Sequence, residues 1–324
     1  MRQKIGRSRK AVVVKITVII LLASMVLLMI TPFIVIPIFV NRHVNYLGYE
    51  LESRPLQDIY EASDFGIEET RRYLITEDGY RLWTSEIYRE QPKAIIIYIS
   101  GMTQPSVTYF YGHAAFMKEK GYASLLLEVR GHGNSEGDRI CLGYEEVKDV
   151  RAAVRFIRND PRYQDVPIVL LGVSMGGAIT INSLGQIEEI DAAIALSAYS
   201  SFEEVVLDHM ESYGFPGFIR VLVKPSIQAA LKLEFGNEAV KHMKPAKQIK
   251  NAKERPVLLI ACDGDSLVPV KNLKRLEKMN PQVETWLRYS KEHMVLKDGD
   301  YKKMAEDTEY CEKILSFLEN KVIQ

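Results

Sequence analysis

Apolar residues form one long run near the start of the chain and several short runs after it. The long run, residues 16–40 (ITVIILLASMVLLMITPFIVIPIFV), spans 25 residues without a charged side chain. A helix that rises about 1.5 Å per residue would exceed the ~30 Å hydrocarbon core of a bilayer over this length. We therefore expect a transmembrane anchor at 16–40, with Pro32 and Pro37 kinking or ending the helix near its far side.

A cleaved signal peptide is the alternative interpretation of this run. Signal peptides have an apolar core of about 7–15 residues, followed by a cleavage site of small residues. Here the apolar run is longer, and the residues after it, Asn41 to Asn45 (NRHVN), offer no such site. No cysteine directly follows the run, so a lipoprotein anchor is also disfavoured. We expect the anchor to be uncleaved.

After residue 70, short apolar runs alternate with helical segments. Strands are expected at 72–75, 80–88, 94–100, 122–129, 166–171, 192–197, 256–262 and 283–289. Helices are expected at 107–120, 144–159, 175–184, 271–279 and 301–318. The first two strands flank Glu77-Asp78-Gly79 and form a hairpin. Strands that alternate with helices predict an α/β fold with a mostly parallel, doubly wound sheet.

Residues 201–254 interrupt this alternation with helical pieces and no convincing strand. Ser201, followed by Glu203 and Glu204, is typical of a capped helix start, and Gly214 and Pro225 are among the residues that break the run. We interpret this segment as a helical insertion over the C-terminal edge of the sheet, where α/β proteins bind ligands. The expected organisation is a basic arm at 1–15, the anchor at 16–40, a stalk at 41–70, and a domain at 71–324 that contains the insertion.

Charge is balanced over the chain but unevenly distributed. The 324 residues include 42 Lys and Arg and 42 Asp and Glu, so no basic excess favours a nucleic-acid partner. Six of the basic residues, and no acidic residue, lie in residues 1–15. The positive-inside rule then places the N-terminus in the cytoplasm and the large domain on the extracytoplasmic side. The three scattered cysteines fit neither a disulfide framework nor a zinc site.

A serine motif follows the strand expected at 166–171. Gly172-Val173-Ser174-Met175-Gly176 has the pattern G-x-S-x-G and opens the helix expected at 175–184. In this context the pattern predicts a nucleophile elbow, a sharp turn that presents the serine hydroxyl above the sheet. The helix N-terminus there favours a developing oxyanion. Ser174 is the candidate nucleophile.

A serine nucleophile needs a base and an acid that orients the base. In a fold with this elbow the chain order is serine, acid, histidine. His209 and His242 lie in the helical insertion and are expected to be exposed, so His293, in the loop after the last strand, is the candidate base. Asp265 and Asp263 both follow the strand at 256–262. Asp265 is favoured because it lies farther past the strand end, whereas Asp263 would cap the turn.

The oxyanion hole requires two backbone N–H groups, one of them from the residue after the nucleophile. Met175 supplies that group. The second is expected from the loop after the strand at 94–100, where Met102 is the candidate. In the insertion, Phe215, Phe218, Ile219 and Leu222 either line an acyl pocket or pack the insertion itself.

These residues resemble the α/β-hydrolase superfamily, and within it the monoacylglycerol-lipase-like and serine-aminopeptidase-like enzymes that carry a short helical cap. The motifs that carry the resemblance are GVSMGG at 172–177, RGHGNSEG at 130–137, DSLVP at 265–269, and His293. The resemblance implies an α/β-hydrolase fold with a Ser174, Asp265 and His293 triad, and a structural role for His132. The chain departs from the usual pattern at Ser100-Gly101, where His-Gly is common, and at Glu128, where Asp is common.

The expected function is hydrolysis of carboxylic esters, especially lipid-derived or other apolar esters, by a membrane-anchored serine hydrolase. The expected partners are a small ester substrate and the membrane, and no metal or organic cofactor is implied. The same triad serves peptidases, amidases and acyltransferases, which remain alternatives. A non-catalytic binding protein is a more remote alternative, because it would require a broken triad.

Overall fold

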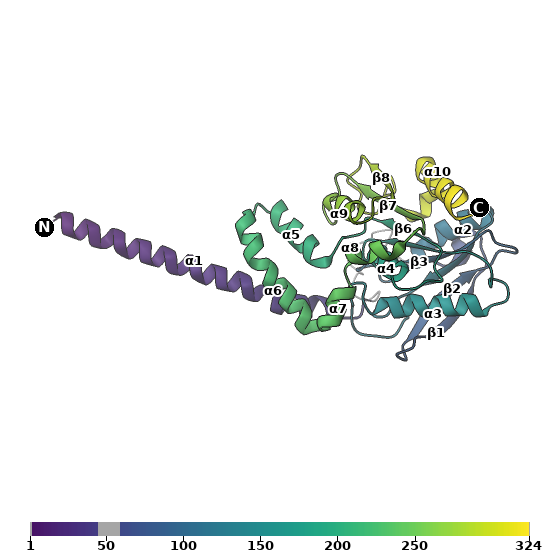
Figure 1. Ribbon diagram of the computed structural model, residues 1–324, viewed down its shortest axis with the longest axis horizontal. Helices are drawn as coiled ribbons and strands as arrows, with labels where there is room; N and C mark the ends of the chain where they lie inside the picture. Colours follow the sequence, from purple (N-terminus) through teal and green to yellow (C-terminus); the bar gives the residue numbers. More distant parts are fainter. Residues whose placement is uncertain (1, 45–58, 324) are drawn as a thin grey trace.

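The computed structural model describes residues 2–44 and 59–323, with side chains from Val12 onwards. Its centre is an eight-stranded sheet in the order β1-β2-β4-β3-β5-β6-β7-β8 (Figure 1). β2 pairs antiparallel with β1 and β4, and every later pair is parallel. The strands are β1 (Thr70–Ile75), β2 (Arg81–Ile87), β3 (Ile95–Ile99), β4 (Ala123–Leu127), β5 (Ile168–Val173), β6 (Ala192–Leu196), β7 (Val257–Cys262) and β8 (Glu284–Arg288).

Two apolar cores lie on opposite faces of this sheet. Along β3, Ile95, Ile97 and Ile99 belong to one core while Ile96 and Tyr98 belong to the other, as the two-residue period of a strand requires. The first core contains side chains of α3 (Glu146–Asn159), α4 (Met175–Leu184) and α9 (Lys271–Met279). The second contains those of α2 (Tyr111–Glu119) and α10 (Thr308–Phe317). The predicted doubly wound α/β sheet is therefore confirmed.

The prediction of a single helix at 301–318 is wrong. The segment forms a 3-10 helix, η5 (Tyr301–Glu306), and then the separate helix α10. Asp307 lies between them, where its carboxylate accepts a hydrogen bond from the backbone N–H of Tyr310 (3.2 Å) and pairs with Arg288 (2.6 Å). The Asp307 side chain thus caps a new helix start.

The predicted insertion at 201–254 is helical. It consists of α5 (Phe202–Ser212), α6 (Gly217–Phe235), α7 (Asn237–His242), α8 (Pro245–Gln248) and the short η4 (Ile249–Ala252). Ser201 caps α5 by accepting a hydrogen bond from the N–H of Glu204 (3.3 Å), as expected. α6 continues through Pro225. We call α5 and α6 the cap.

The N-terminal apolar run forms α1 (Arg2–Val40), one helix that continues through Pro32 and Pro37 and projects from the rest of the molecule (Figure 1). Side chains from Val12 to Ile30 are largely exposed, and the apolar helix is long enough to cross a membrane. Nearer its C-terminal end, however, α1 packs against the domain: Leu28 and Phe39 contact the first core, and Ile36 and Val40 are buried in it.

A stalk was expected to separate α1 from the domain, but the end of α1 and the residues after it contact the domain directly. The N–H of Ile140 donates to the carbonyl of Val40 (2.8 Å), and the N–H of Gly133 donates to that of Val44 (2.8 Å). Asn41 donates to Glu234 at the end of α6 (2.8 Å). Residues 45–58, about half of the stalk expected at 41–70, lie outside the described residues. Residues 41–44 do not separate the helix from the domain.

Candidate active site

Ser174 lies on the predicted turn between β5 and α4. Its backbone has φ 58° and ψ −117°, a conformation that strains any residue with a side chain and that persists only where the surroundings enforce it. Here the N–H of Ser174 donates to the carbonyl of Leu196 (2.8 Å). A Cβ at Gly176 would lie 2.2 Å from the carbonyl oxygen of Ile99, so only glycine allows α4 to pack this closely on the sheet.

His293 and Asp265 come together at the C-terminal ends of β8 and β7. The distance between His293 Nδ1 and Asp265 Oδ2 is 2.7 Å. The other carboxylate oxygen of Asp265 accepts hydrogen bonds from the N–H groups of Leu267 (2.8 Å) and Val268 (2.9 Å). The buried Asp265 carboxylate is therefore fixed in place and orients the imidazole. Asp263 is exposed and instead accepts from the N–H of Ser290 (3.0 Å).

Two hydroxyl groups fix the loop that carries His293. Ser197 Oγ donates to the carbonyl of His293 (2.6 Å), and the Tyr301 hydroxyl donates to that of Met294 (2.9 Å). Both donors come from other parts of the chain, since Ser197 follows β6 and Tyr301 begins η5. The imidazole position is thus determined by the backbone on one side and by Asp265 on the other.

Ser174, His293 and Met102 line one cavity of about 380 Å³. Met175, the other candidate oxyanion donor, follows Ser174 directly as the first residue of α4. The structure thus brings the sequence-predicted residues to one place. The remaining lining is mostly apolar and comes from α1, the cap and the loops after β3, β6 and β7: Phe39, Thr103, Gln104, Tyr199, Phe202, Val205, Val206, His209, Leu267 and Val268.

Buried polar groups support the loop that carries Met102. The His132 imidazole lies between the carbonyls of Met102 (Nε2, 3.0 Å) and Arg130 (Nδ1, 3.1 Å). Burial lowers the pKa of His132, so a neutral ring donates to one of these carbonyls. His132 contacts the oxyanion loop and not Asp265, in agreement with the structural role that the resemblance implies.

Glu128, one of the two departures from the family pattern, is a buried acceptor. It accepts hydrogen bonds from Ser106 Oγ and from the N–H of Asn134, both at 2.6 Å. Burial is the main cause that raises the pKa of Glu128 to about 7. The carboxyl group therefore links the loop after Met102 to the loop after His132.

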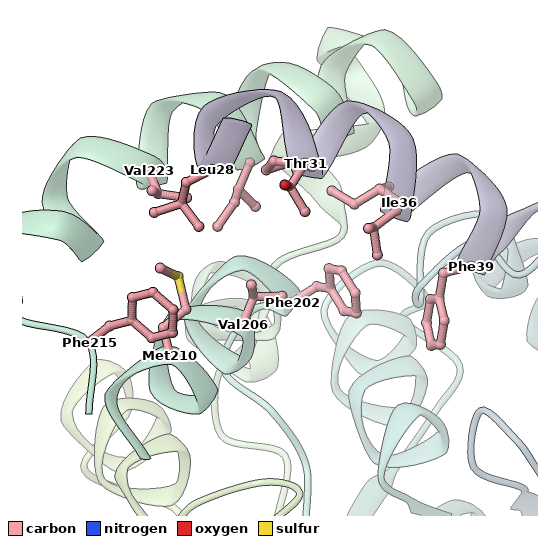
Figure 2. A pocket seen from close by; sticks show the side chains of 12 residues that line it. Leu28, Thr31, Ile36, Phe39, Phe202, Val206, Met210, Phe215 and Val223 are labelled. Carbon is pink, nitrogen blue, oxygen red and sulfur yellow. The ribbon is translucent and has the colours of Figure 1, made fainter. Parts of the chain in front are cut away.

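The four cap residues that were expected to line an acyl pocket or to pack the insertion are not part of the Ser174 cavity. Phe215 lines a second cavity, of about 210 Å³, between α1 and the cap (Figure 2). Phe218 and Leu222 are exposed, and Ile219 is half-buried against the first core.

Several residues that line the Ser174 cavity were not predicted from the sequence. Phe39 comes from the presumed anchor, and Phe202 and Val206 come from α5. His209, expected to be exposed, is half-buried, lines the cavity, and has its Nε2 2.8 Å from the carbonyl of Leu267. His242 is exposed, as expected. A signal existed for Phe202 and Val206, which lie four residues apart on one helical face, but their inward direction depends on tertiary packing.

Among the described residues, no group of three or more His, Cys, Asp or Glu side chains is placed to hold a metal ion. Cys141, Cys262 and Cys311 are buried and free.

The sheet order, the helices on both faces, and a serine elbow at the edge of the parallel strands define an α/β hydrolase. Residues 90–213 match the family model described as serine aminopeptidase, S33. The chain has the α/β-hydrolase fold, and this segment, less than half of the chain, is similar to that hydrolase family.

Three relatives illustrate this similarity. Mouse (Mus musculus) monoglyceride lipase is 53% identical over 53 residues, which are 16% of this chain and only 17% of the lipase. The uncharacterized protein YqkD of Bacillus subtilis (strain 168) is 24% identical over 240 residues, covering 73% of this chain and 76% of YqkD. The structure of the Pyrococcus furiosus esterase Pf2001 matches with a TM-score of 0.62 and 21% identity, covering 86% of this chain and 98% of the esterase. The last likeness concerns the fold.

Proposed function

We propose that this protein is a membrane-anchored serine hydrolase that cleaves apolar carboxylic esters through an acyl-enzyme. The observation that carries the proposal is the convergence of three features on one cavity: Ser174 on a strained elbow, the His293–Asp265 pair, and an apolar lining. The local identity to a monoglyceride lipase and the fold shared with an esterase support it.

The mechanism follows from the roles that these groups can fill. Neutral His293 takes the proton of Ser174 Oγ as the oxygen attacks the ester carbonyl, while Asp265 stabilises the resulting imidazolium. The N–H groups of Met102 and Met175 donate to the oxyanion, and each such donor typically contributes ~10²–10³ in rate. The alcohol leaves with the proton from His293. Water, deprotonated by His293, then attacks the acyl-enzyme and releases the acid and Ser174.

A peptidase with the same triad is the second candidate, because the matching family model is described as a serine aminopeptidase. An aminopeptidase must bind the charged amino group of its substrate, and a buried ammonium needs a paired anion. No Asp or Glu side chain occurs among the described residues that line the Ser174 cavity. This lining favours an uncharged ester.

Labelling with a fluorophosphonate, in which Ser174 Oγ would displace fluoride, tests the nucleophile. We expect labelling of the wild type and none of Ser174→Ala, with Ser316→Ala, at an exposed position of α10, as a control away from the cavity. Matched butanoyl ester and butanoyl amide substrates then test the reaction class. Labelling that is equal in wild type and Ser174→Ala would refute the mechanism, and hydrolysis of the amide alone would favour the peptidase.

We also propose that α1 spans the membrane with its N-terminus in the cytoplasm and the catalytic domain on the extracytoplasmic side. The support is the apolar helix and the six basic residues before Ile16. The test uses cells whose cell wall or outer membrane has been made permeable while the cytoplasmic membrane stays intact. In these cells an added protease should digest the catalytic domain. A domain that is digested only after this membrane is lysed would have the opposite orientation.

A further inference from the structure

A second cavity lies between α1 and the cap, and it is almost entirely apolar. α1 contributes Leu28, Val35 and Phe39, and facing side chains include Val206 and Met210 of α5 (Figure 2). One lining residue, Thr31, has a hydroxyl, and this group donates to the carbonyl of Leu27 within the helix (2.9 Å). The cavity, which we call the helix–cap groove, therefore presents hydrocarbon surface to an occupant.

The helix–cap groove adjoins the Ser174 cavity, and the two cavities share a wall. Phe39, Phe202 and Val206 line both cavities. The Phe39 and Phe202 rings are stacked with their centroids 6.3 Å apart. In Figure 2 these two rings lie at one end of the groove, while Leu28, Met210 and Phe215 lie at the other end. The groove thus extends from the wall of the catalytic cavity towards the middle of α1.

The length of α1 places the outer end of the groove at the bilayer. The charge-free part of α1, residues 16–40, has 25 residues, whereas about 20 helical residues cross a ~30 Å hydrocarbon core. Twenty residues counted from Ile16 end at Val35, so the first groove residues of α1, from Leu28 to Val35, lie within the part that a bilayer would cover. The loop and helix start beside this end expose apolar side chains, since Tyr213, Phe218 and Val221 are each at least 65% exposed.

We infer that the helix–cap groove binds the long acyl chain of an ester that enters from the bilayer, and that α1 forms one wall of this binding site. The inference rests on the proposed ester hydrolysis and adds a substrate class to it. The substrates are esters of long unbranched acyl chains, which enter the site from the membrane. On this basis α1 is part of the substrate site as well as an anchor. The ester carbonyl lies at Ser174, and the chain passes Phe39 and Val206 towards Leu28.

Matched tryptophan substitutions on α1 test the groove in the full-length protein. Val35 lines the groove, whereas Val26, on the same helix, is exposed and does not. Val35→Trp should lower the ratio of kcat/KM for a hexadecanoyl ester to that for a butanoyl ester by about tenfold, measured in phosphatidylcholine vesicles. Val206→Trp, at the shared wall, should act in the same direction, and Val26→Trp should leave the ratio unchanged. An unchanged ratio in Val35→Trp and Val206→Trp would overturn the inference.

A second measurement does not depend on how the variants fold. A hexadecyl fluorophosphonate with a diazirine at the end of its chain is attached to Ser174 of the wild-type protein and irradiated. We expect the adduct on the walls of the groove, within residues 28–39 of α1 or residues 202–227 of the cap of the same chain. Adducts confined to elements that do not line the groove, or to the α1 helix of a second copy, would exclude this groove as the acyl site.

These outcomes separate the inference from the proposed function. Fluorophosphonate labelling of Ser174 and hydrolysis of the butanoyl ester report the catalytic mechanism alone. If labelling and butanoyl ester hydrolysis both occur, but the ratio of kcat/KM values and the adduct position differ from those expected for the groove, only the assignment of the acyl site is wrong. If neither occurs in the wild type, the proposed ester hydrolysis itself fails.

Discussion

The imidazole of His293 lies with Nδ1 2.7 Å from Oδ2 of the buried Asp265, whose other oxygen accepts two backbone N–H groups. This arrangement holds the tautomer in which Nδ1 carries the proton and Nε2 is free to act as a base. A carboxylate held in this way stabilises the imidazolium that forms when Ser174 is deprotonated. The contact with His293 makes Asp265 a candidate catalytic residue, and Asp263, two residues earlier, serves as its control.

Asp265→Asn should lower kcat about 10⁴-fold while the fold is retained, because the amide can hold the wrong tautomer. Asp263→Asn is the matched control: Asp263 is exposed, and its Oδ1 atom, which accepts from the N–H of Ser290, is kept by asparagine. Hydrolysis of a butanoyl ester measures both variants. A comparable loss in the two variants would show that the loop, and not the Asp265 carboxylate, limits activity.

Ser197→Ala should lower kcat about fivefold and leave KM nearly unchanged. Its hydroxyl donates to the carbonyl of His293 (2.6 Å), and one such hydrogen bond typically contributes about 1 kcal/mol. Ser197 is a positioning residue, since it acts through the backbone of His293. Ser290→Ala is the control in the same loop, where the hydroxyl accepts from the N–H of Glu292 (3.0 Å) and makes no hydrogen bond to His293. An unchanged kcat in Ser197→Ala would contradict this role.

The sequence predicted the sheet and the elbow well because both depend on local patterns. Buried strands appear as short β-branched runs, and G-x-S-x-G between a strand and a helix leaves few alternatives for Ser174. Asp265 and His293 could be chosen because the strand order of this fold brings the ends of β7 and β8 beside the elbow. The break at Asp307 was missed because it depends on the tertiary pair with Arg288.

The wall formed by α1 could not be predicted from the sequence in the same way. An apolar helical face has the same pattern whether lipid or protein covers it, so Phe39 and Val40 read as membrane residues. The inward direction of Phe202, Val206 and His209 is likewise decided by how the cap packs on α1 and the loop at Leu267. Hydrophobic periodicity shows that a face is covered, but it does not show what covers it.

Glu128 should make the stability of the protein depend on pH. Burial raises the pKa of Glu128 to about 7, above the value of about 4.3 of an unfolded glutamate. Between these values the folded state binds more protons than the unfolded state, so the free energy of unfolding falls as pH rises from about 4 to about 7 and then levels off. The contribution is on the order of 4 kcal/mol, at 1.36 kcal/mol for each of the ~2.7 pKa units.

The measurement is the difference between wild type and Glu128→Gln in chemical denaturation at a series of pH values. Buried His113 and His132 have lowered pKa values and therefore act in the opposite direction, but they do so equally in both proteins. We expect the stability of the wild type, relative to Glu128→Gln, to fall steadily over this range. Parallel curves would show that Glu128 has the same pKa in both states.

The end of α1 should stabilise the catalytic domain. Val40 is fully buried, and its carbonyl accepts from the N–H of Ile140 in the chain that continues from the RGHG motif. Val40→Ala removes two buried methyl groups and should lower the free energy of unfolding by about 2 kcal/mol. Val26→Ala, at an exposed position of the same helix, should change this free energy by less than about 0.5 kcal/mol.

Urea denaturation of the full-length protein in detergent micelles, followed by the fluorescence of Trp83 and Trp286, measures both variants. Equal midpoints would mean that α1 only tethers the domain, whereas the expected difference requires that the helix and the domain unfold together.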